Sequence, residues 1–305
     1  MDRIEALRVF VTVAELSSFS QAAQVLNLPR SSVTAGVQQV EKEFGTRLLQ
    51  RTTRKVNLTQ NGQTCIERCR DLLADLEELQ SMFRERGELA GKLRVDMSIG
   101  IAANWIIPQL PVFLAKHPRL ELELGSTDRP VDVIREGFDC VIRVGEVAES
   151  GLIARRLGWL KILNCVSPAY IQRYGIPHDP GSLGAHRLVR YVPFLGTAAE
   201  GFEWVDRTGG SLHTTDMAGV LTVNNSPAYR AACLAGLGMI QVPEIGVHSD
   251  LASGSLIEVM PDFRAAPMPV TMIFPHRRQL PARVRAFMDW AEALLQPALM
   301  TSADA

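Results

Sequence analysis

The chain of 305 residues lacks an excess of charge of either sign, with a formal net charge of −1. A surface that is basic throughout is therefore excluded, and any contact with nucleic acid must come from a local patch. No stretch approaches the roughly 18 uninterrupted apolar residues of a membrane span. The first residues, Met1–Glu5, carry acids where a secretory signal has an apolar run. We therefore expect neither a membrane span nor a signal.

Cysteines are few, odd in number and dispersed: Cys65, Cys69, Cys140, Cys165 and Cys233. This usage favours a reduced, cytoplasmic protein over a disulfide framework. Cys65 and Cys69 lie one helical turn apart, but no histidine or further cysteine is near them in sequence, so we expect no metal site.

Catalytic signatures are also lacking. The six histidines are isolated, and the chain contains no H-E-x-x-H, P-loop, G-x-S-x-G or C-x-x-C pattern. We therefore predict no enzyme activity, no catalytic residue and no cofactor. The length exceeds one typical core, and 47% hydrophobic with 21% charged residues is typical of globular proteins. Two or three domains are expected.

Residues 18–55 predict a helix-turn-helix with a basic wing, preceded by a helix at 2–16. Ser18 and Gln21 have the spacing of a capping box. Pro29 separates two helices, since proline suits the start of a new one. The second helix, 29–44, has an apolar stripe at Val33, Val37, Val40 and Phe44. The alternative to a DNA-binding motif is an ordinary helical hairpin whose polar face is exposed to solvent.

The other face of that second helix is polar and free of acids until Glu41, which suits a helix that reads base edges in a DNA major groove. No acid occurs between Glu43 and Glu67, where Leu49, Val56 and Leu58 could anchor a hairpin with a basic tip. Such a tip suits phosphate contact. The predicted DNA contacts are Ser18, Arg30, Ser31, Ser32, Thr34, Gln38, Arg51, Thr53, Arg54 and Lys55.

Thr59 is placed to cap a long helix that reaches about Gly87 and measures roughly 40 Å. Its apolar residues recur at intervals of four and three, which is the spacing of a coiled-coil seam. We therefore predict a homodimer through Cys69, Leu72, Leu76, Leu79 and Phe83, with Cys65 in the same seam.

Beyond residue 88, predicted strands alternate with helices, which favours a parallel sheet in an α/β fold. The expected strands are 93–98, 120–125, 139–144, 152–159, 162–167, 188–191, 219–223, 238–242 and 270–274. The expected helices are 104–116, 131–136, 168–174, 226–235 and 281–295. Two lobes joined by two crossing strands would enclose a ligand cleft.

Polar residues at the strand ends are candidates for that cleft, because free N–H groups at helix N-termini attract anions. We expect a small, carboxylate-bearing effector to meet Ser98, Gly100, Ile101, Ala102, Asn104, Thr127, Asp128, Arg143, Gly145, Asn224, Asn225 and Ser226. The alternative for each is turn or cap chemistry. Arg143 could instead form a structural ion pair with Asp128 or Asp139.

Two sets of motifs carry a family resemblance that covers essentially the whole chain. The N-terminal set is FSQAA at 19–23, LN at 26–27, VE at 40–41, FG at 44–45, LL at 48–49, RTTR at 51–54 and LTxxG at 58–62. The C-terminal set is LPxF at 110–113, HP at 117–118, DRPVD at 128–132, EGxD at 136–139, IRxG at 142–145, ARRLG at 154–158, SPAY at 167–170 and AGLGM at 235–239. Together they resemble the LysR-type transcriptional regulators, in the CrgA-like branch.

The resemblance implies an α/β protein with an all-α N-terminal module: a winged helix-turn-helix (1–58), a long linker helix (59–87) and a two-lobed periplasmic-binding-protein-like effector domain (88–305). Lobe I would span about 91–161 and 268–297, and lobe II about 162–267. It also implies a homotetramer on dyad-symmetric DNA, in the cytoplasm at the nucleoid, controlled by a small molecule and able to contact RNA polymerase.

Three positions depart from the family pattern. The family often has serine at Pro29, a basic residue at Ala35 and a hydroxyl residue at Gly100, for which Ser98 would be the nearest substitute. The departures at Pro29 and Ala35 affect the contacts of the helix with the DNA groove. The departure at Gly100 affects which effector can bind. Two alternatives stay open: a redox sensor that uses Cys140, Cys165 or Cys233, and a small-molecule-binding protein whose ligand does not control DNA binding.

Overall fold

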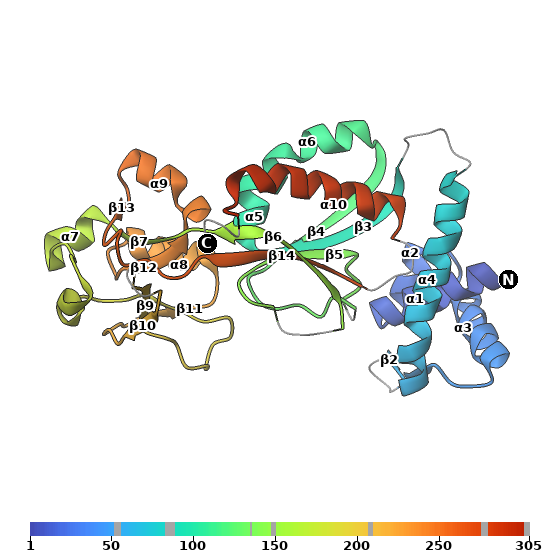
Figure 1. Ribbon diagram of the computed structural model, residues 1–305. Coiled ribbons are helices and arrows are strands. Elements are labelled where there is room, and N and C mark those ends of the chain that lie inside the picture. The colour runs from blue at the N-terminus through green and yellow to red at the C-terminus, as the bar shows by residue number, and fades with distance from the viewer. Residues whose placement is uncertain are drawn as a thin grey trace. The chain divides into compact units, whose positions relative to one another are not determined.

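The computed structural model describes residues 1–51, 56–82, 89–134, 136–147, 151–206, 210–275 and 280–301 (Figure 1). The chain divides into two compact units. The N-terminal unit contains Met1–Gly91 with two short later segments, and the C-terminal unit contains most of the rest.

The N-terminal unit is the predicted helix-turn-helix with a two-stranded wing. Its elements are α1 (Arg3–Leu16), α2 (Phe19–Val25), α3 (Arg30–Phe44), β1 (Leu49–Arg51), β2 (Val56–Leu58) and α4 (Gln60–Met82). The wing strands are antiparallel, with Leu49 opposite Leu58. Val33, Val37 and Val40 of α3 are buried, as predicted, but Phe44 is 51% exposed and lies outside the core.

Two glycines allow close approach of helices in this unit. A Cβ on Gly36 would lie 2.9 Å from Met1 Sδ and 3.0 Å from Val9 Cγ1, so its absence lets α3 pack tightly against α1. A Cβ on Gly62 would lie 2.0 Å from the carbonyl oxygen of Leu48. The first turn of α4 therefore rests directly on the backbone at the base of the wing.

Lobe I of the C-terminal unit is built on a five-stranded sheet of order β4-β3-β5-β14-β6. The strands are β3 (Ala90–Met97), β4 (Arg119–Ser126), β5 (Cys140–Val144), β6 (Ile153–Leu160) and β14 (Met268–Phe274). β3 and β5 are parallel, but β14 is antiparallel to both β5 and β6. The parallel pairing predicted for the first strands is confirmed for β3 and β5. The sheet of lobe I as a whole is mixed, because β14 re-enters from lobe II in the opposite direction.

The helices of lobe I differ from the prediction in two places. The helical run starts at Ile99 rather than Asn104: α5 (Ile99–Ile101), a π-helical turn (Ala102–Ile106) and α6 (Ile107–Lys116) follow without a break. The helix predicted at 131–136 is wrong, since the described residues there form turns that bury Val133 against the sheet. α10 (Ala282–Leu295) was predicted and packs Phe287 and Trp290 against Phe113.

By length and composition alone, Ile99–Lys116 would qualify as a membrane span, and 22% of it is buried. The sequence had predicted no such segment. A single such helix is weak evidence, because core helices of globular proteins have the same properties. Here Ile101, Ile106 and Phe113 are buried in lobe I, while Ile107 and Val112 are exposed.

Lobe II is centred on the antiparallel strands β12 (Ile240–Pro243), β7 (Ile162–Val166) and β13 (Ile257–Glu258). A parallel pair, β8 (Arg190–Tyr191) and β11 (Thr222–Val223), continues this layer through the bridge between Leu188 and Met239. α7 (Pro168–Tyr174) and α8 (Ser226–Leu234) lie close to their predicted ranges.

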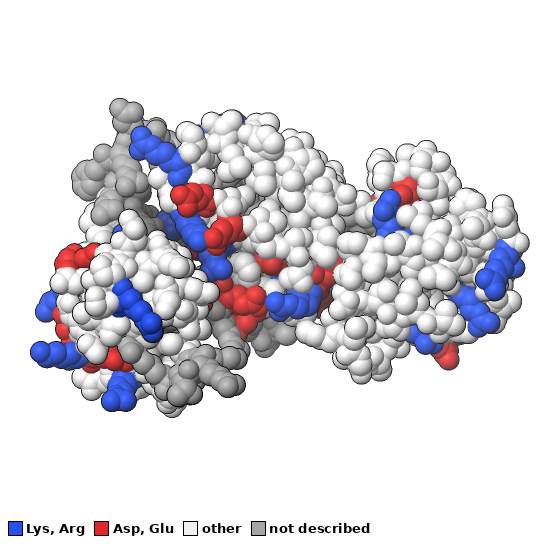
Figure 2. Space-filling model, turned by 180° about the vertical axis from the view of Figure 1, so that it is seen from behind, with Lys and Arg blue, Asp and Glu red and all other residues white. Residues whose placement is uncertain are grey.

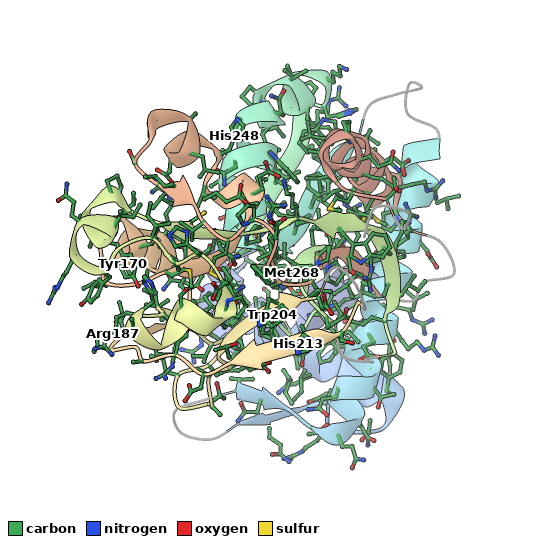
Figure 3. The ribbon with its side chains drawn as sticks, turned by 60° about the vertical axis from the view of Figure 1, so that its left-hand side comes forward. Tyr170, Arg187, Trp204, His213, His248 and Met268 are labelled. Carbon is green, nitrogen blue, oxygen red and sulfur yellow. The ribbon has the colours of Figure 1, made fainter. Side chains whose placement is uncertain are left out.

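The hairpin of β9 (Phe202–Val205) and β10 (Leu212–Thr215) was not predicted, nor were α9 (His248–Ser253) and β13. Trp204 on β9 stacks on His213 of β10 with ring centroids 4.4 Å apart, as their labels in Figure 3 indicate. In the same view Tyr170 and Arg187 lie together, and the Arg187 amide donates to the Tyr170 hydroxyl at 2.8 Å.

The chain crosses between the lobes twice. A single residue, Lys161, separates β6 of lobe I from β7 of lobe II, and the return path runs from β13 to β14. These two crossings place the ends of the lobe I strands next to lobe II, and the polar residues at those ends define the candidate site.

Candidate DNA-reading helix and effector cleft

The exposed face of α3 carries the residues predicted to read DNA. Arg30 is its first helical residue, and Ser31 and Gln38 are exposed with it, while Ser32 and Thr34 are half-buried. The opposite side is held in the core by three valines. A helix fixed on one side and polar on the other has the form that a major groove admits.

Ser18 has a structural role of its own. Its hydroxyl accepts a hydrogen bond from the Gln21 amide at 3.2 Å, so it caps α2 as the sequence predicted. A hydroxyl that is used as a cap can still donate its proton, so the position of Ser18 at the start of α2 leaves its predicted DNA contact as a prediction.

The base of the wing is tied to α3 by one carboxylate. Oε1 of Glu41 accepts hydrogen bonds from the amides of Leu48 and Leu49 at 2.9 and 3.0 Å. Arg51 ends β1, but Thr53, Arg54 and Lys55 of the predicted tip lie outside the described residues. On the face of this unit seen in Figure 2, acidic and basic side chains are interspersed.

The linker helix α4 begins as predicted, since the Thr59 hydroxyl accepts from the Gly62 amide at 2.9 Å. The seam prediction is wrong for Cys69, which is 2% exposed and packs in the core of its own unit together with Cys65. Leu72 and Leu79 are 58% and 52% exposed. Leu76 is half-buried, and Phe83 lies outside the described residues.

Burial also removes two predicted cleft residues. Ile101 and Ala102 are each 1% exposed and belong to the interior of lobe I, so they offer no surface to an effector. Ser98 is 8% exposed, and its hydroxyl accepts from the Val144 amide at 3.3 Å. Gly100 faces open space, and the Asn104 amide group donates back to its carbonyl oxygen at 3.0 Å.

Asp128 joins the strand ends of the two lobes. Its Oδ1 accepts from the Ile99 amide at 3.0 Å, and its Oδ2 accepts from the Ser226 amide at 2.7 Å. Thr127 precedes it, and the Thr127 hydroxyl accepts from the Arg129 amide at 3.3 Å. The sequence predicted that these segments meet, but it did not predict that an aspartate of the chain would bond both helix starts.

Of the remaining predicted residues of lobe II, only Asn225 acts as a helix cap. The Asn225 side chain accepts from the Ala228 amide at 2.9 Å and so caps α8. Asn224 is exposed and accepts from the Asn225 side chain at 3.3 Å. Asn225 therefore acts as a helix cap, which was the alternative to its predicted contact with an effector.

Arg143 is committed to a buried ion pair, but its partner is Asp96, not Asp128 or Asp139. Both side chains are at least nine-tenths buried, and a Cβ on Gly125 would lie 2.3 Å from Oδ2 of Asp96. Gly145 forms a turn with φ of +97°, and its amide donates to the Pro269 carbonyl at 2.8 Å. Arg143 thus stabilises the sheet of lobe I and is not presented to the cleft.

Lobe II contains a polar pocket of about 130 Å³ that was not predicted from the sequence. Tyr191, Tyr229 and Gln241 line it together with Glu200 and Glu203. The Gln241 amide N–H donates to the Tyr229 hydroxyl at 3.0 Å, and its side chain accepts from the Glu203 amide at 2.9 Å. Tyr191 ends β8, Gln241 lies in β12 and Tyr229 lies in α8. Tyrosine and glutamine carry no turn signal that could have identified these positions from the sequence.

Burial sets the ionisation of this pocket. It raises the pKa of the Tyr229 phenol, and it raises the pKa of Tyr191, which the negative charge of Asp128 raises further. The pKa of Glu203 is raised by burial and by the neighbouring Glu200. Both phenols therefore stay neutral at physiological pH and can serve as hydrogen-bond donors.

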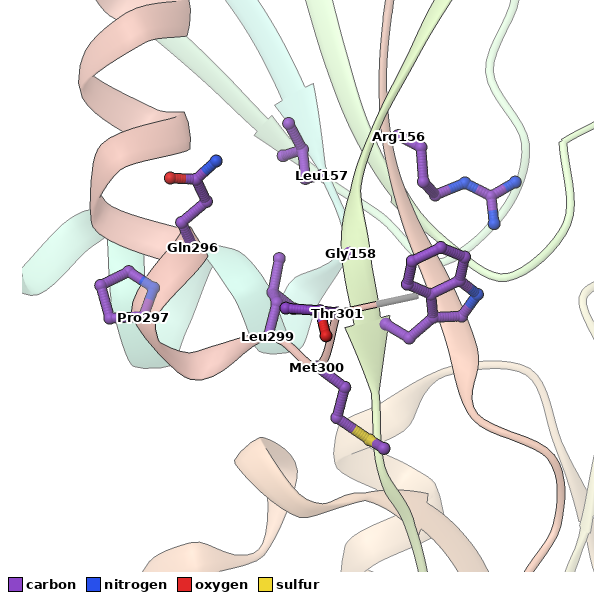
Figure 4. Close-up of a pocket in the computed structure, with 9 residues that line it drawn as sticks. Arg156, Leu157, Gly158, Gln296, Pro297, Leu299, Met300 and Thr301 are labelled. Atoms are coloured by element: carbon purple, nitrogen blue, oxygen red, sulfur yellow. The ribbon is translucent and has the colours of Figure 1, made fainter. Parts of the chain in front are cut away.

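A second hollow, of about 610 Å³, lies away from the strand ends that were predicted to bind an effector. It is formed by Arg156–Trp159 of β6 and, from the C-terminal segment, by Gln296, Pro297, Leu299, Met300 and Thr301 (Figure 4). Trp159 and Met300 form an antiparallel bridge there, so the C-terminal segment covers the free edge of β6.

Two family models account for nearly all of the chain. "Bacterial regulatory helix-turn-helix protein, lysR family" matches residues 4–63, and "LysR substrate binding domain" matches residues 86–296. The chain belongs to the LysR family of transcriptional regulators. It has a DNA-binding helix-turn-helix domain and an effector-binding domain, and the predicted resemblance is confirmed.

Relatives of this LysR-type regulator match it along most of their length. The "Uncharacterized HTH-type transcriptional regulator YhjC" of Escherichia coli K12 is 47% identical over 97% of this chain and 99% of its own. The "HTH-type transcriptional repressor PA14_22550" of Pseudomonas aeruginosa is 34% identical over 96% and 92%. The solved structure of CrgA from Neisseria meningitidis is 27% identical, with a TM-score of 0.60 over 95% and 97%.

The cysteines of this regulator are poorly suited to redox sensing. Burial raises the pKa of Cys165 and of Cys69 to about 12, and it raises the pKa of Cys140 and Cys233 as well. A thiol with a raised pKa carries little of the reactive thiolate at neutral pH. Among the described residues, no group of three or more His, Cys, Asp or Glu is arranged to hold a metal ion.

Proposed function

We propose that this LysR-type regulator reads a dyad-symmetric operator with two copies of α3 and responds to a small effector in the cleft beside Asp128. The observation that carries the first part is the polar, exposed side of α3, opposite three buried valines. In this proposal residues 1–58 read the DNA, residues 59–87 form the dimer contact and residues 88–305 bind the effector. A catalytic role forms no part of the proposal.

Groove reading is assigned to Arg30, Ser31 and Gln38, with Ser32 and Thr34 at the edge of the same face. The wing residues Arg51, Thr53, Arg54 and Lys55 supply phosphate contacts. Arginine is suited to guanine and glutamine to adenine, since each can form two hydrogen bonds with one base edge. Base choice is thus assigned to α3 and general affinity to the wing.

Effector binding is assigned to the strand ends around Ser98, Asp128 and Ser226 and to the adjoining pocket of Tyr191 and Tyr229. The two tyrosines pack edge to face with ring centroids 5.4 Å apart. Neutral phenols would fix the orientation of a small polar ligand, while the aromatic rings supply apolar contact. The Gln241 side chain holds the pocket wall, since it already bonds Asn164 and Glu203. The pocket volume of about 130 Å³ favours a ligand of few atoms or a part of a larger one.

Assembly is assigned to two surfaces. Leu72 and Leu79 lie seven residues apart on α4 and are exposed, as a helix pair requires. A homotetramer needs a second contact, and α6 offers Ile107 and Val112, which are 48% and 58% exposed. The occupant proposed for that face is a second copy of the chain, because family members oligomerise. The tetramer would act at the nucleoid in the cytoplasm, where contact with RNA polymerase is open to it.

Fluorescence anisotropy with DNA from upstream of the regulator's own gene tests the reading helix. Arg30→Ala should lower the preference for that DNA over random DNA by about 1–3 kcal/mol, or roughly 5- to 150-fold. Arg173→Ala, which removes an exposed arginine from lobe II, serves as the charge-matched control and should change nothing. If both variants keep the wild-type preference, α3 does not read the operator through Arg30.

A further inference from the structure

The carboxylate of Asp128 occupies an unusual place, between two helix starts that belong to different lobes. Its half-buried side chain accepts from the amide of Ile99, where the helical run of lobe I begins. It also accepts from the amide of Ser226, where α8 of lobe II begins. At 3.0 and 2.7 Å, both distances are those of good charge-assisted hydrogen bonds.

The first amides of a helix have no partner within the helix, and they lie at the positive end of its dipole. A negative group is therefore favoured there, and two converging helix starts form a stronger anion position than one. In this chain the Asp128 carboxylate already fills the anion position between the two helix starts. α8 does not need Asp128 for its own cap, because Asn225 bonds the Ala228 amide from within lobe II.

The arginines of the neighbouring segments already have partners other than Asp128. Arg143 pairs with Asp96, Arg190 donates to the Met217 carbonyl at 3.0 Å, and Arg129 donates to the Pro130 carbonyl at 3.3 Å. The adjoining pocket carries two acids, Glu200 and Glu203, and one cation, Arg190. An acidic ligand would have to displace the Asp128 carboxylate from the two helix starts, whereas a neutral or cationic ligand would not.

We propose that Asp128 is a clasp that joins lobes I and II, and that its carboxylate excludes acidic effectors from the position between the two helix starts. The native cleft then takes a neutral or cationic effector, in contrast to the carboxylate expected from the sequence. This inference rests on the proposed function only in naming the ligand an effector, since the clasp is a property of the chain without one.

Chemical rescue tests the clasp in the full-length protein. Asp128→Gly should speed hydrogen exchange by about tenfold or more in peptides that contain the Ile99 and Ser226 amides, because each loses a charged acceptor. Sodium formate should then slow that exchange again by supplying a carboxylate at the vacated position. Sodium chloride at the same ionic strength should not, and wild-type protein should not respond to formate.

Asn225→Ala is the matched control. It removes an acceptor from the first turn of α8 but none from lobe I, so exchange should rise near Ala228, stay unchanged at Ile99 and not respond to formate. If Asp128→Gly does not fold, Asp128→Asn carries the test, because its amide nitrogen cannot accept and one of the two amides must exchange faster.

The clasp is overturned if a folded Asp128→Gly protein keeps wild-type exchange at either amide. It is equally overturned if formate fails to restore protection or protects the wild type to the same extent. Neither measurement involves DNA or an effector. Loss of the clasp therefore leaves the operator experiment standing, and a failure of the operator experiment leaves the exchange result standing.

Discussion

Single atoms decide several contacts in this regulator, and Gly62 is the clearest case. The Leu48 carbonyl oxygen lies 2.0 Å from the position that a Cβ would take. That oxygen also accepts hydrogen bonds from the backbone and the side chain of Thr59, so it is held in place. The glycine in the LTxxG motif therefore has a steric reason that the sequence alone could not supply.

Gly62→Ala should destabilise the N-terminal unit by about 1–3 kcal/mol, because either α4 or the wing must shift to admit the methyl group. Urea denaturation followed by circular dichroism would measure the loss. Gly100→Ala is the control, since nothing lies within 4 Å of its Cβ position, and its effect should stay within about 0.5 kcal/mol. Equal stability of the two variants would contradict the packing argument.

Thiol reactivity gives a second prediction at this scale. Cys140, Cys165 and Cys233 are buried with raised pKa values, so their modification by iodoacetamide should stay slow as the pH rises from 7 to 9. An unperturbed thiol, with a pKa of about 8.5, gains more than tenfold in thiolate over that range. Mass spectrometry of the native protein would show the difference, with the urea-unfolded chain as the fast control. Rapid labelling of Cys233 would revive the redox alternative.

Elements were predicted from sequence to different degrees. α3, α7 and α10 were predicted closely because apolar spacing and a preceding cap or proline are local signals. The helix expected at 131–136 failed because a turn buries Val133 against β5 and β14, which is a tertiary contact. The direction of β14 and the bonds of Asp128 also depend on residues far apart in the chain, so no local pattern contained them.

The linker helix yields a prediction for an element. Replacement of Leu72 and Leu79 by aspartate should halve the mass of the tetramer and leave a dimer through the contact proposed for α6, because a charge in a helix–helix seam cannot be desolvated without a partner. Light scattering at several concentrations would measure the mass. Gln63→Asp places the same charge on the opposite, exposed face of α4 and should leave the wild-type mass unchanged. A variant at both leucines that keeps the wild-type mass would remove α4 as an assembly contact.

At the scale of the whole molecule, two compact units predict two thermal transitions in calorimetry. The transition of the C-terminal unit should depend on pH, because burial lowers the pKa of His186, which bonds the Tyr170 hydroxyl at 3.1 Å. A histidine that is harder to protonate when folded makes the unfolded chain bind more protons. Stability from this group is therefore complete above the unfolded pKa of about 6.5 and falls as the pH drops below it.

Calorimetric scans at pH 7.5 and 5.5 would check this expectation, with the transition of the N-terminal unit as the internal reference. His186→Gln should reduce the difference between the two scans, while it lowers the C-terminal transition at both pH values by weakening the bond to Tyr170. If the C-terminal transition shifts with pH by the same amount in His186→Gln as in the wild type, groups other than His186 cause the acid sensitivity.

The seat of α4 on the wing has a mechanical consequence. Thr59 caps the helix, Gly62 touches the Leu48 backbone, and Glu41 pins Leu48 and Leu49 to α3. No flexible hinge therefore separates the start of α4 from α3, and the two helices move as one rigid body. A rotation of α4 about its axis must turn α3 through the same angle, so a small torque on the linker helix changes the orientation of α3 in the DNA groove.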